Sequence, residues 1–134
     1  MIPVQQTQFE EGAGNSLDAC VATLLELPLD RVPHFNGHGA RWMVEMNRFL
    51  GKFGFAAFII EAHAVRSVCW PIDGYSIACG QSSHGLHAVV WKGSEMVHDP
   101  HPDGEGLAGP PMSFTLLCAL DPSRRKLRRG RRKD

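Results

Sequence analysis

Gly14-Asn15-Ser16-Leu17-Asp18-Ala19-Cys20-Val21-Ala22-Thr23-Leu24-Leu25 is the stretch that decides the fold. It begins as a glycine-containing loop and continues with apolar residues at helical spacing, which predicts a buried helix over residues 16–26. Ser16 then lies in the first turn, where unpaired N–H groups and the helix dipole create a partial positive charge. This position favours a thiolate nucleophile, whereas a serine gains much less from it.

The rest of the chain divides into a second helix and a set of strands. Residues 41–52 carry an apolar stripe at helical spacing, which predicts a helix whose stripe packs in the core. After Gly54 the period becomes strand-like, with strands expected at 55–60, 75–79, 86–91, 95–98 and 114–120. Lys92-Gly93 indicates a tight hairpin. Helices followed by strands predict an α+β fold, with N-terminal helices packed on a C-terminal antiparallel sheet.

Length and charge predict one domain and a tail. The chain has 134 residues, which is enough for one domain with its own core, expected over residues 1–122. Residues 123–134 hold 8 of the 14 basic residues and 1 of the 14 acidic ones, which leaves a net charge of −7 on residues 1–122. A block of like charge is typically disordered. We therefore expect a basic, disordered tail that can contact an acidic partner or nucleic acid.

The N-terminal residues and the cysteines indicate where in the cell the protein is expected. The first residues have neither a basic stretch nor an apolar core, so they do not form a signal peptide, and the longest apolar runs are too short to cross a membrane. The four cysteines form no CxxC pair and no zinc-ribbon spacing, so buried, reduced thiols are expected. These observations favour a cytoplasmic protein, in a bacterium or in a host cell, with no membrane partner.

Four residues have the chemistry of a nucleophilic site. Ser16 begins the first helix, and His87 opens a strongly apolar strand. Asp99 ends the next strand of the same hairpin, so its carboxylate is expected beside His87. A nucleophile needs a base, and the base needs a third group that fixes its tautomer. Gln6, upstream of the helix, is a candidate donor to the negative oxygen of a tetrahedral intermediate.

Three segments resemble papain-fold cysteine peptidases of the bacteriocin-leader (double-glycine) type. Asn15-Ser16-Leu17-Asp18-Ala19-Cys20-Val21-Ala22 is similar to their catalytic helix start, Leu86-His87-Ala88-Val89-Val90 to their His-Ala-Val strand, and Val97-His98-Asp99-Pro100 to their Asp-Pro strand end. The chain is also similar in style to small single-domain papain-fold proteins of phages and bacteria. The resemblance covers residues 4–102.

The resemblance implies a papain-like fold and a catalytic triad. It places Ser16 in the nucleophile position, His87 as the base, Asp99 as the orienting acid and Gln6 as the oxyanion donor, with Gln8 as the less favoured candidate for that last role. The implied activity is hydrolysis of a peptide or amide bond, or of an isopeptide or thioester bond, in a peptide or protein substrate. Deamidation and acyl transfer use the same groups. No cofactor or metal is implied.

Ser16 departs from the family pattern, which has cysteine at that position. One reading is a deliberate Cys-to-Ser replacement, which gives an inactive mutant. The other is a natural inactive relative that binds without cutting. The retained His87 and Asp99 favour the deliberate replacement. In either case this chain is expected to be inactive or nearly so.

Other functions compete with the triad. A catalytically inactive peptide- or protein-binding module is the first alternative. A metal-dependent hydrolase is the second, because several potential ligands lie close in sequence, namely His84, His87, His98, Asp99 and His101. Cys20 is a further candidate nucleophile, but one turn into the helix its thiol is expected to be buried and inert.

Overall fold

A computed structural model describes residues 1–10, 14–63 and 74–120. Two helices, α1 (Ser16–Leu25) and α2 (Trp42–Gly51), precede five strands. The strands are β1 (Phe55–Glu61), β2 (Tyr75–Ser82), β3 (Gly85–Lys92), β4 (Glu95–His98) and β5 (Ser113–Ala119). The predicted α+β class is confirmed. The tail expected at 123–134 lies outside the described residues.

The five strands form one antiparallel sheet in the order β1-β5-β2-β3-β4. The β3–β4 hairpin closes where Lys92-Gly93 predicted it, and Gly93 has the positive φ of 60° that such a tight turn requires. The sequence did not reveal that β5 inserts between β1 and β2. After β4, the loop of residues 99–112 leads the chain back to the sheet, where β5 begins.

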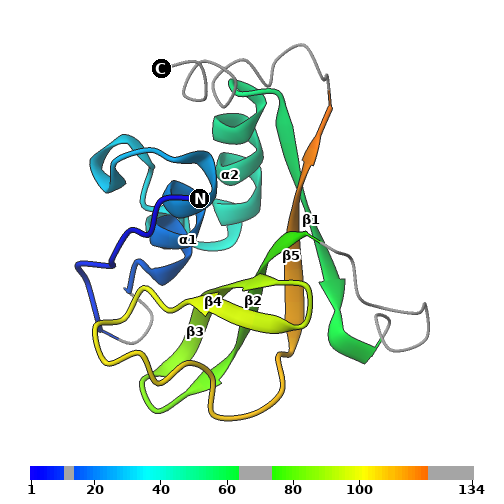
Figure 1. Cartoon of the computed structure of the whole chain (residues 1–134). Helices are drawn as coiled ribbons and strands as arrows, with labels where there is room; N and C mark the ends of the chain where they lie inside the picture. The colour runs from blue at the N-terminus through cyan, green and yellow to red at the C-terminus, as the bar shows by residue number, and fades with distance from the viewer. Residues whose placement is uncertain (11–13, 64–73, 121–134) are drawn as a thin grey trace.

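Both helices cover one face of the sheet, where α1 packs against β2 and β3 and α2 packs against β1 (Figure 1). The core between them contains fully buried side chains from α1, α2 and the sheet, among them Val21, Met46, Leu50, Ile77 and Val90. The apolar stripe predicted for α2 therefore packs in the core. A smaller cluster of Ala78, Val89 and Phe114, with Leu107 of the 99–112 loop against it, covers part of the other face.

Two short 3-10 segments connect the helices. They are η1 (Leu29–Arg31) and η2 (Phe35–Arg41). Phe35 explains this second segment, because its fully buried ring packs against Phe49 of α2 and draws the chain onto the core. Within the described ranges, no helix combines the length and apolar character needed to cross a bilayer.

The α2 helix offers a matched test of the core. Leu50 is fully buried, whereas Val44 on the same helix is 50% exposed. Leu50→Ala should lower the free energy of unfolding by about 2–5 kcal/mol, because it removes buried methyl groups and leaves a cavity. Val44→Ala should change it by no more than about 0.5 kcal/mol. Urea denaturation followed by circular dichroism measures both, and equal effects would contradict this packing.

Candidate active site

Ser16 is the first residue of α1, and its hydroxyl lies against the sheet. The Ser16 Oγ accepts a hydrogen bond from the backbone N–H of Ala88 at 3.2 Å. The side chain of the N-cap residue, Asn15, makes no capping hydrogen bond to α1 and so leaves the first N–H groups of the helix available. The hydroxyl therefore lies next to β3, one residue from His87.

His87 and Asp99 form a buried pair. Their side chains are joined at 2.7 Å between Nε2 of His87 and Oδ1 of Asp99, and the two residues are only 6% and 8% exposed. The carboxylate accepts a hydrogen bond from the Nε2–H, so Nδ1 is the ring nitrogen that remains for a second partner. No hydrogen bond joins Ser16 to His87 within the described part of the chain.

The carboxylate of Asp99 is ionised although it is buried. Burial raises the pKa of its carboxyl, but the hydrogen bond from His87 and those from the backbone N–H groups of His101 and Gly106 more than offset this and lower it. The two backbone bonds measure 2.9 Å and 2.8 Å. An ionised Asp99 fixes both the tautomer and the orientation of the His87 ring.

The N-terminal segment, residues 2–8, runs as a strap between α1 and the end of β4. The backbone of Ile2 and Val4 bonds to Thr23 of α1, and the other side of the strap is held by His98 and Pro100. The Nε2–H of His98 donates to the Val4 carbonyl at 2.7 Å, and the Gln6 N–H donates to the Pro100 carbonyl at 3.0 Å. This strap carries Gln6 into the site.

Asn15 joins the strap to the start of α1. Its Oδ1 accepts hydrogen bonds from the backbone N–H groups of Thr7 and Gln8, both at 2.9 Å, and its Nδ2 donates to the Thr7 hydroxyl. An asparagine at this position usually caps the helix, but here its side chain binds the strap instead. The sequence placed Asn15 directly before Ser16 without revealing this positioning role.

The Gln6 side chain has a fixed orientation and an unused oxygen. Its Nε2 donates one hydrogen to the Gln8 carbonyl at 2.8 Å, and exchanging the two amide atoms would place an oxygen against that carbonyl. The second Nε2 hydrogen remains available. The buried Oε1 has no hydrogen-bond partner within the described part of the chain. Gln6 is 6% exposed, whereas Gln8 is exposed at the surface.

A cleft of about 370 Å³ brings these groups together. Ser16, His87 and Gln6 all line it, whereas Gln8 does not. The remaining lining residues are Phe9, Glu10, Gly14, Asn36, His84, Leu86 and His101. The volume lies in the usual range for small-molecule and peptide side-chain pockets. Three of the four predicted site residues thus line one cleft, and the fourth, Asp99, is hydrogen-bonded to His87.

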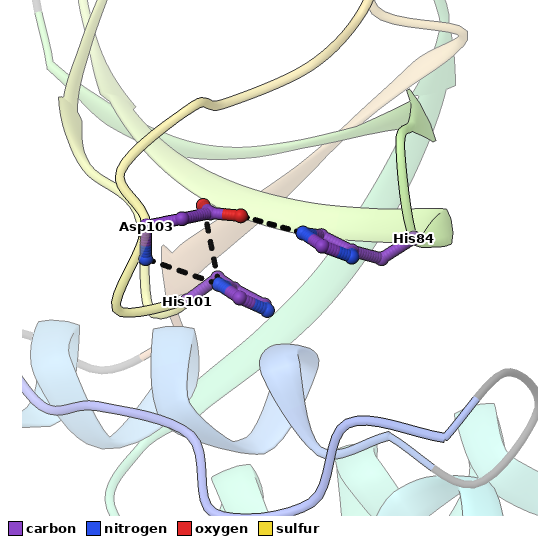
Figure 2. A group of neighbouring side chains, drawn as sticks. All are labelled: His84, His101 and Asp103. Carbon is purple, nitrogen blue, oxygen red and sulfur yellow. Dashed lines mark hydrogen bonds and ion pairs between the residues drawn. The ribbon is translucent and has the colours of Figure 1, made fainter.

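The histidines that suggested a metal site do not form one group. His87 is paired with Asp99, and His98 donates to the Val4 carbonyl in the strap. His84 and His101 do come together, with their rings stacked 4.0 Å apart, and Asp103 joins them (Figure 2). Bonds from the Glu105 N–H and from His84 lower the pKa of Asp103. The sequence did not identify Asp103 as a member of this cluster.

The cysteines near the site are poor nucleophiles. Cys20 is fully buried, and desolvation raises the pKa of its thiol well above the usual range, with nearby negative groups adding to the effect. Burial also raises the pKa of Cys79 to about 11, although a hydrogen bond with Ser113 opposes the shift. A thiolate forms readily at neither position. Cys20 is therefore buried as expected and unsuited to act as the nucleophile.

Asp18 is a further polar group that the sequence patterns did not single out. It is buried on α1, where it accepts hydrogen bonds from His34 at 2.8 Å and from the Phe35 N–H at 3.1 Å. Burial raises the pKa of Asp18, and these two bonds limit the rise. An acidic residue inside an apolar helical stretch was the available signal. Asp18 anchors the segment that follows η1 beside the cleft.

Comparisons with protein families, with curated proteins and with solved structures find no match for this chain.

Asp99 should make a pH-dependent contribution to stability. The pKa of this carboxyl falls below its ordinary value of 3.8 on folding, so its stabilising effect is complete above that value and is lost as the pH falls through the folded pKa. The difference in unfolding free energy between the native chain and Asp99→Asn should therefore be constant near pH 5–6 and narrow below about pH 4. Urea titrations at each pH measure it. Asp30→Asn, at the exposed turn η1, is the control, and an Asp99→Asn difference that widens on acidification would contradict the assignment.

Proposed function

We propose that the cleft is a papain-like acyl-transfer site that binds the carbonyl group of a peptide or amide substrate, with serine in place of the nucleophilic cysteine. The observation that supports this most strongly is the buried His87–Asp99 pair beside Ser16 at the start of α1. A histidine held through one ring nitrogen presents the other as the base, as nucleophilic catalysis requires, and here Nε2 is held and Nδ1 is free. Thioester and isopeptide carbonyls fit the same chemistry.

In the cysteine form, each group has a defined role. The thiol at position 16 transfers its proton to Nδ1 of His87, and the thiolate attacks the carbonyl carbon. The second Nε2–H of Gln6 and the backbone N–H of residue 16 stabilise the negative oxygen. Protonated His87 then gives its proton to the leaving amine, and water releases the acyl group. The free Oε1 of Gln6 suits an N–H donor of the substrate.

With serine at position 16, the first step, transfer of the nucleophile's proton to His87, is strongly disfavoured. A serine hydroxyl is a far weaker acid than a thiol, so the helix start and a histidine beside it generate little alkoxide. We infer that the chain with Ser16 binds its substrate and turns it over slowly or not at all. A second candidate function is therefore a peptide- or protein-binding module. The hydrogen bond from the Ala88 N–H to Ser16 Oγ favours it, because the hydroxyl is already engaged as an acceptor.

Restoring the thiol tests whether the site is built for catalysis. Ser16→Cys should react with iodoacetamide at position 16 near pH 6, because His87 stabilises the thiolate. In the Ser16→Cys, His87→Ala double variant that rate should fall by roughly 10-fold or more, since an unassisted thiol has a pKa near 8.5. Peptide mapping by mass spectrometry locates the label, and the native chain gives the background from its own cysteines.

The matched control is the Ser16→Cys, His84→Ala double variant. All alkylation assays contain EDTA, so that no metal ion influences the rate. His84 lines the same cleft but pairs with Asp103 and, among the described residues, forms no hydrogen bond with His87 or Asp99, so its loss should leave the alkylation rate unchanged. If position 16 reacts equally fast with and without His87, the site is not catalytic and the binding module is the correct function.

The two glutamines provide a second matched test. In the Ser16→Cys background, Gln6→Ala should slow acylation by p-nitrophenyl acetate by about 10²–10³-fold, the usual effect of removing one oxyanion donor. Gln8→Ala should have little effect, because that side chain is exposed and does not line the cleft. Release of p-nitrophenolate follows the reaction. A larger loss with Gln8→Ala would transfer the oxyanion role to Gln8.

A further inference from the structure

His84, His101 and Asp103 come from two loops that meet at the rim of the cleft. His84 lies in the turn between β2 and β3, and the other two lie in the loop after β4. Figure 2 shows the three side chains pointing toward one another. One potential ligand atom from each lies within 4.8 Å of the others. This convergence is separate from the His87–Asp99 pair.

The donor set matches a particular class of cation. Two imidazole nitrogens and one carboxylate oxygen suit Zn²⁺ and similar first-row transition ions, whereas Mg²⁺ and Ca²⁺ prefer oxygen ligands throughout. Around a tetrahedral ion with bonds near 2.0–2.1 Å, ligand atoms stand about 3.4 Å apart. His84 Nε2 lies 2.6 Å from Asp103 Oδ2, and His101 Nδ1 lies 3.1 Å both from Asp103 Oδ1 and from the backbone N–H of Asp103, which donates to it. Because the two imidazole rings are stacked 4.0 Å apart, binding of an ion requires His101 to turn away from that N–H and from the His84 ring.

Neighbouring groups hold the two loops and the Asp103 carboxylate in place. The Glu105 N–H donates to Asp103 Oδ1 at 3.0 Å, and the Ser83 hydroxyl bonds Glu105 across the two loops at 2.9 Å. The backbone N–H of His101 is anchored on Asp99, and its ring packs edge-on against Phe9 at 5.1 Å. Outer contacts of this kind orient the ligands of metal sites and contribute to their affinity.

We propose that His84, His101 and Asp103 bind a zinc-class divalent cation at the rim of the cleft. With three protein ligands, the ion keeps a fourth position for water or for a ligand oxygen, as open zinc sites do. Two of the ligands, His84 and His101, also line the cleft. The ion therefore stands at the cleft entrance and links the β2–β3 turn to the loop after β4. It leaves His87 free for the role proposed above.

Calorimetric titration of the full chain, with Ser16 unchanged, tests this site independently of any catalysis. The native protein should bind one Zn²⁺, and Mg²⁺ should give no binding. Asp103→Asn keeps the oxygen that accepts from the Glu105 N–H but removes the charge, and both it and His84→Ala should weaken zinc binding at least ~10-fold. His38→Ala, at an exposed histidine outside the cluster, should bind as tightly as the native chain.

Two further measurements distinguish zinc bound at this cluster from zinc bound elsewhere on the chain. Zinc should raise the melting temperature of the native chain and of His38→Ala, but not that of Asp103→Asn, whose metal-free melting temperature reports whether it is folded. Co²⁺ should bind without the charge-transfer absorption of a thiolate ligand, since the ligands are nitrogen and oxygen. Absence of zinc binding, unchanged affinity in both variants, or a thiolate–cobalt band would overturn the proposal.

Discussion

The carboxylate of Asp99 is the interaction on which the geometry of the cleft depends. It is nearly inaccessible to water, and its charge is compensated by three donors, namely His87 of β3 and the backbone N–H groups of His101 and Gly106. A buried charge is tolerated only when its hydrogen bonds are complete. One residue therefore determines both the direction of the His87 ring and the path of the chain after β4. That path in turn places His101 and Asp103 opposite His84, so the His87–Asp99 pair and the histidine cluster share one support.

The strap supplies the second half of the arrangement. Residues 2–8 have little regular structure of their own, yet they are bonded on one side to α1 and on the other to the end of β4. Asn15 adds two bonds from the helix start. Gln6 therefore belongs to a segment fixed at several points, and its amide needs no rearrangement to act as a donor. Preorganised dipoles of this kind stabilise developing charge more effectively than groups that must first move.

Local patterns predicted the elements well, because hydrophobic period and turn residues act within a few positions. The two helices and five strands lie close to their expected bounds. The sequence also indicated Ser16, His87, Asp99 and Gln6, which the fold brings to one cleft and its support. It did not reveal β5 between β1 and β2, the strap contacts of Asn15, or the pairing of Asp18 with His34. These depend on contacts outside the few neighbouring positions within which hydrophobic period and turn residues act. Sequence proximity likewise grouped His98 with the other histidines, although its hydrogen bond to Val4 directs it elsewhere.

The strap also has a consequence for folding order. Val4 and His98 are 94 residues apart, and Ser16 and Ala88 are 72 apart. Contacts of such separation close long loops, and a fold rich in them forms more slowly than one built from local contacts. The helix that bears Ser16 is made early in synthesis, but its partners on β3 and β4 arrive much later. The cleft is thus complete only once β3 and β4 have been made. Besides these hydrogen bonds, Val4 of the strap packs against the core between the helices and the sheet. Loss of the strap would remove Gln6 from the cleft, and exchange of the Val4 and Gln6 amide hydrogens would report it.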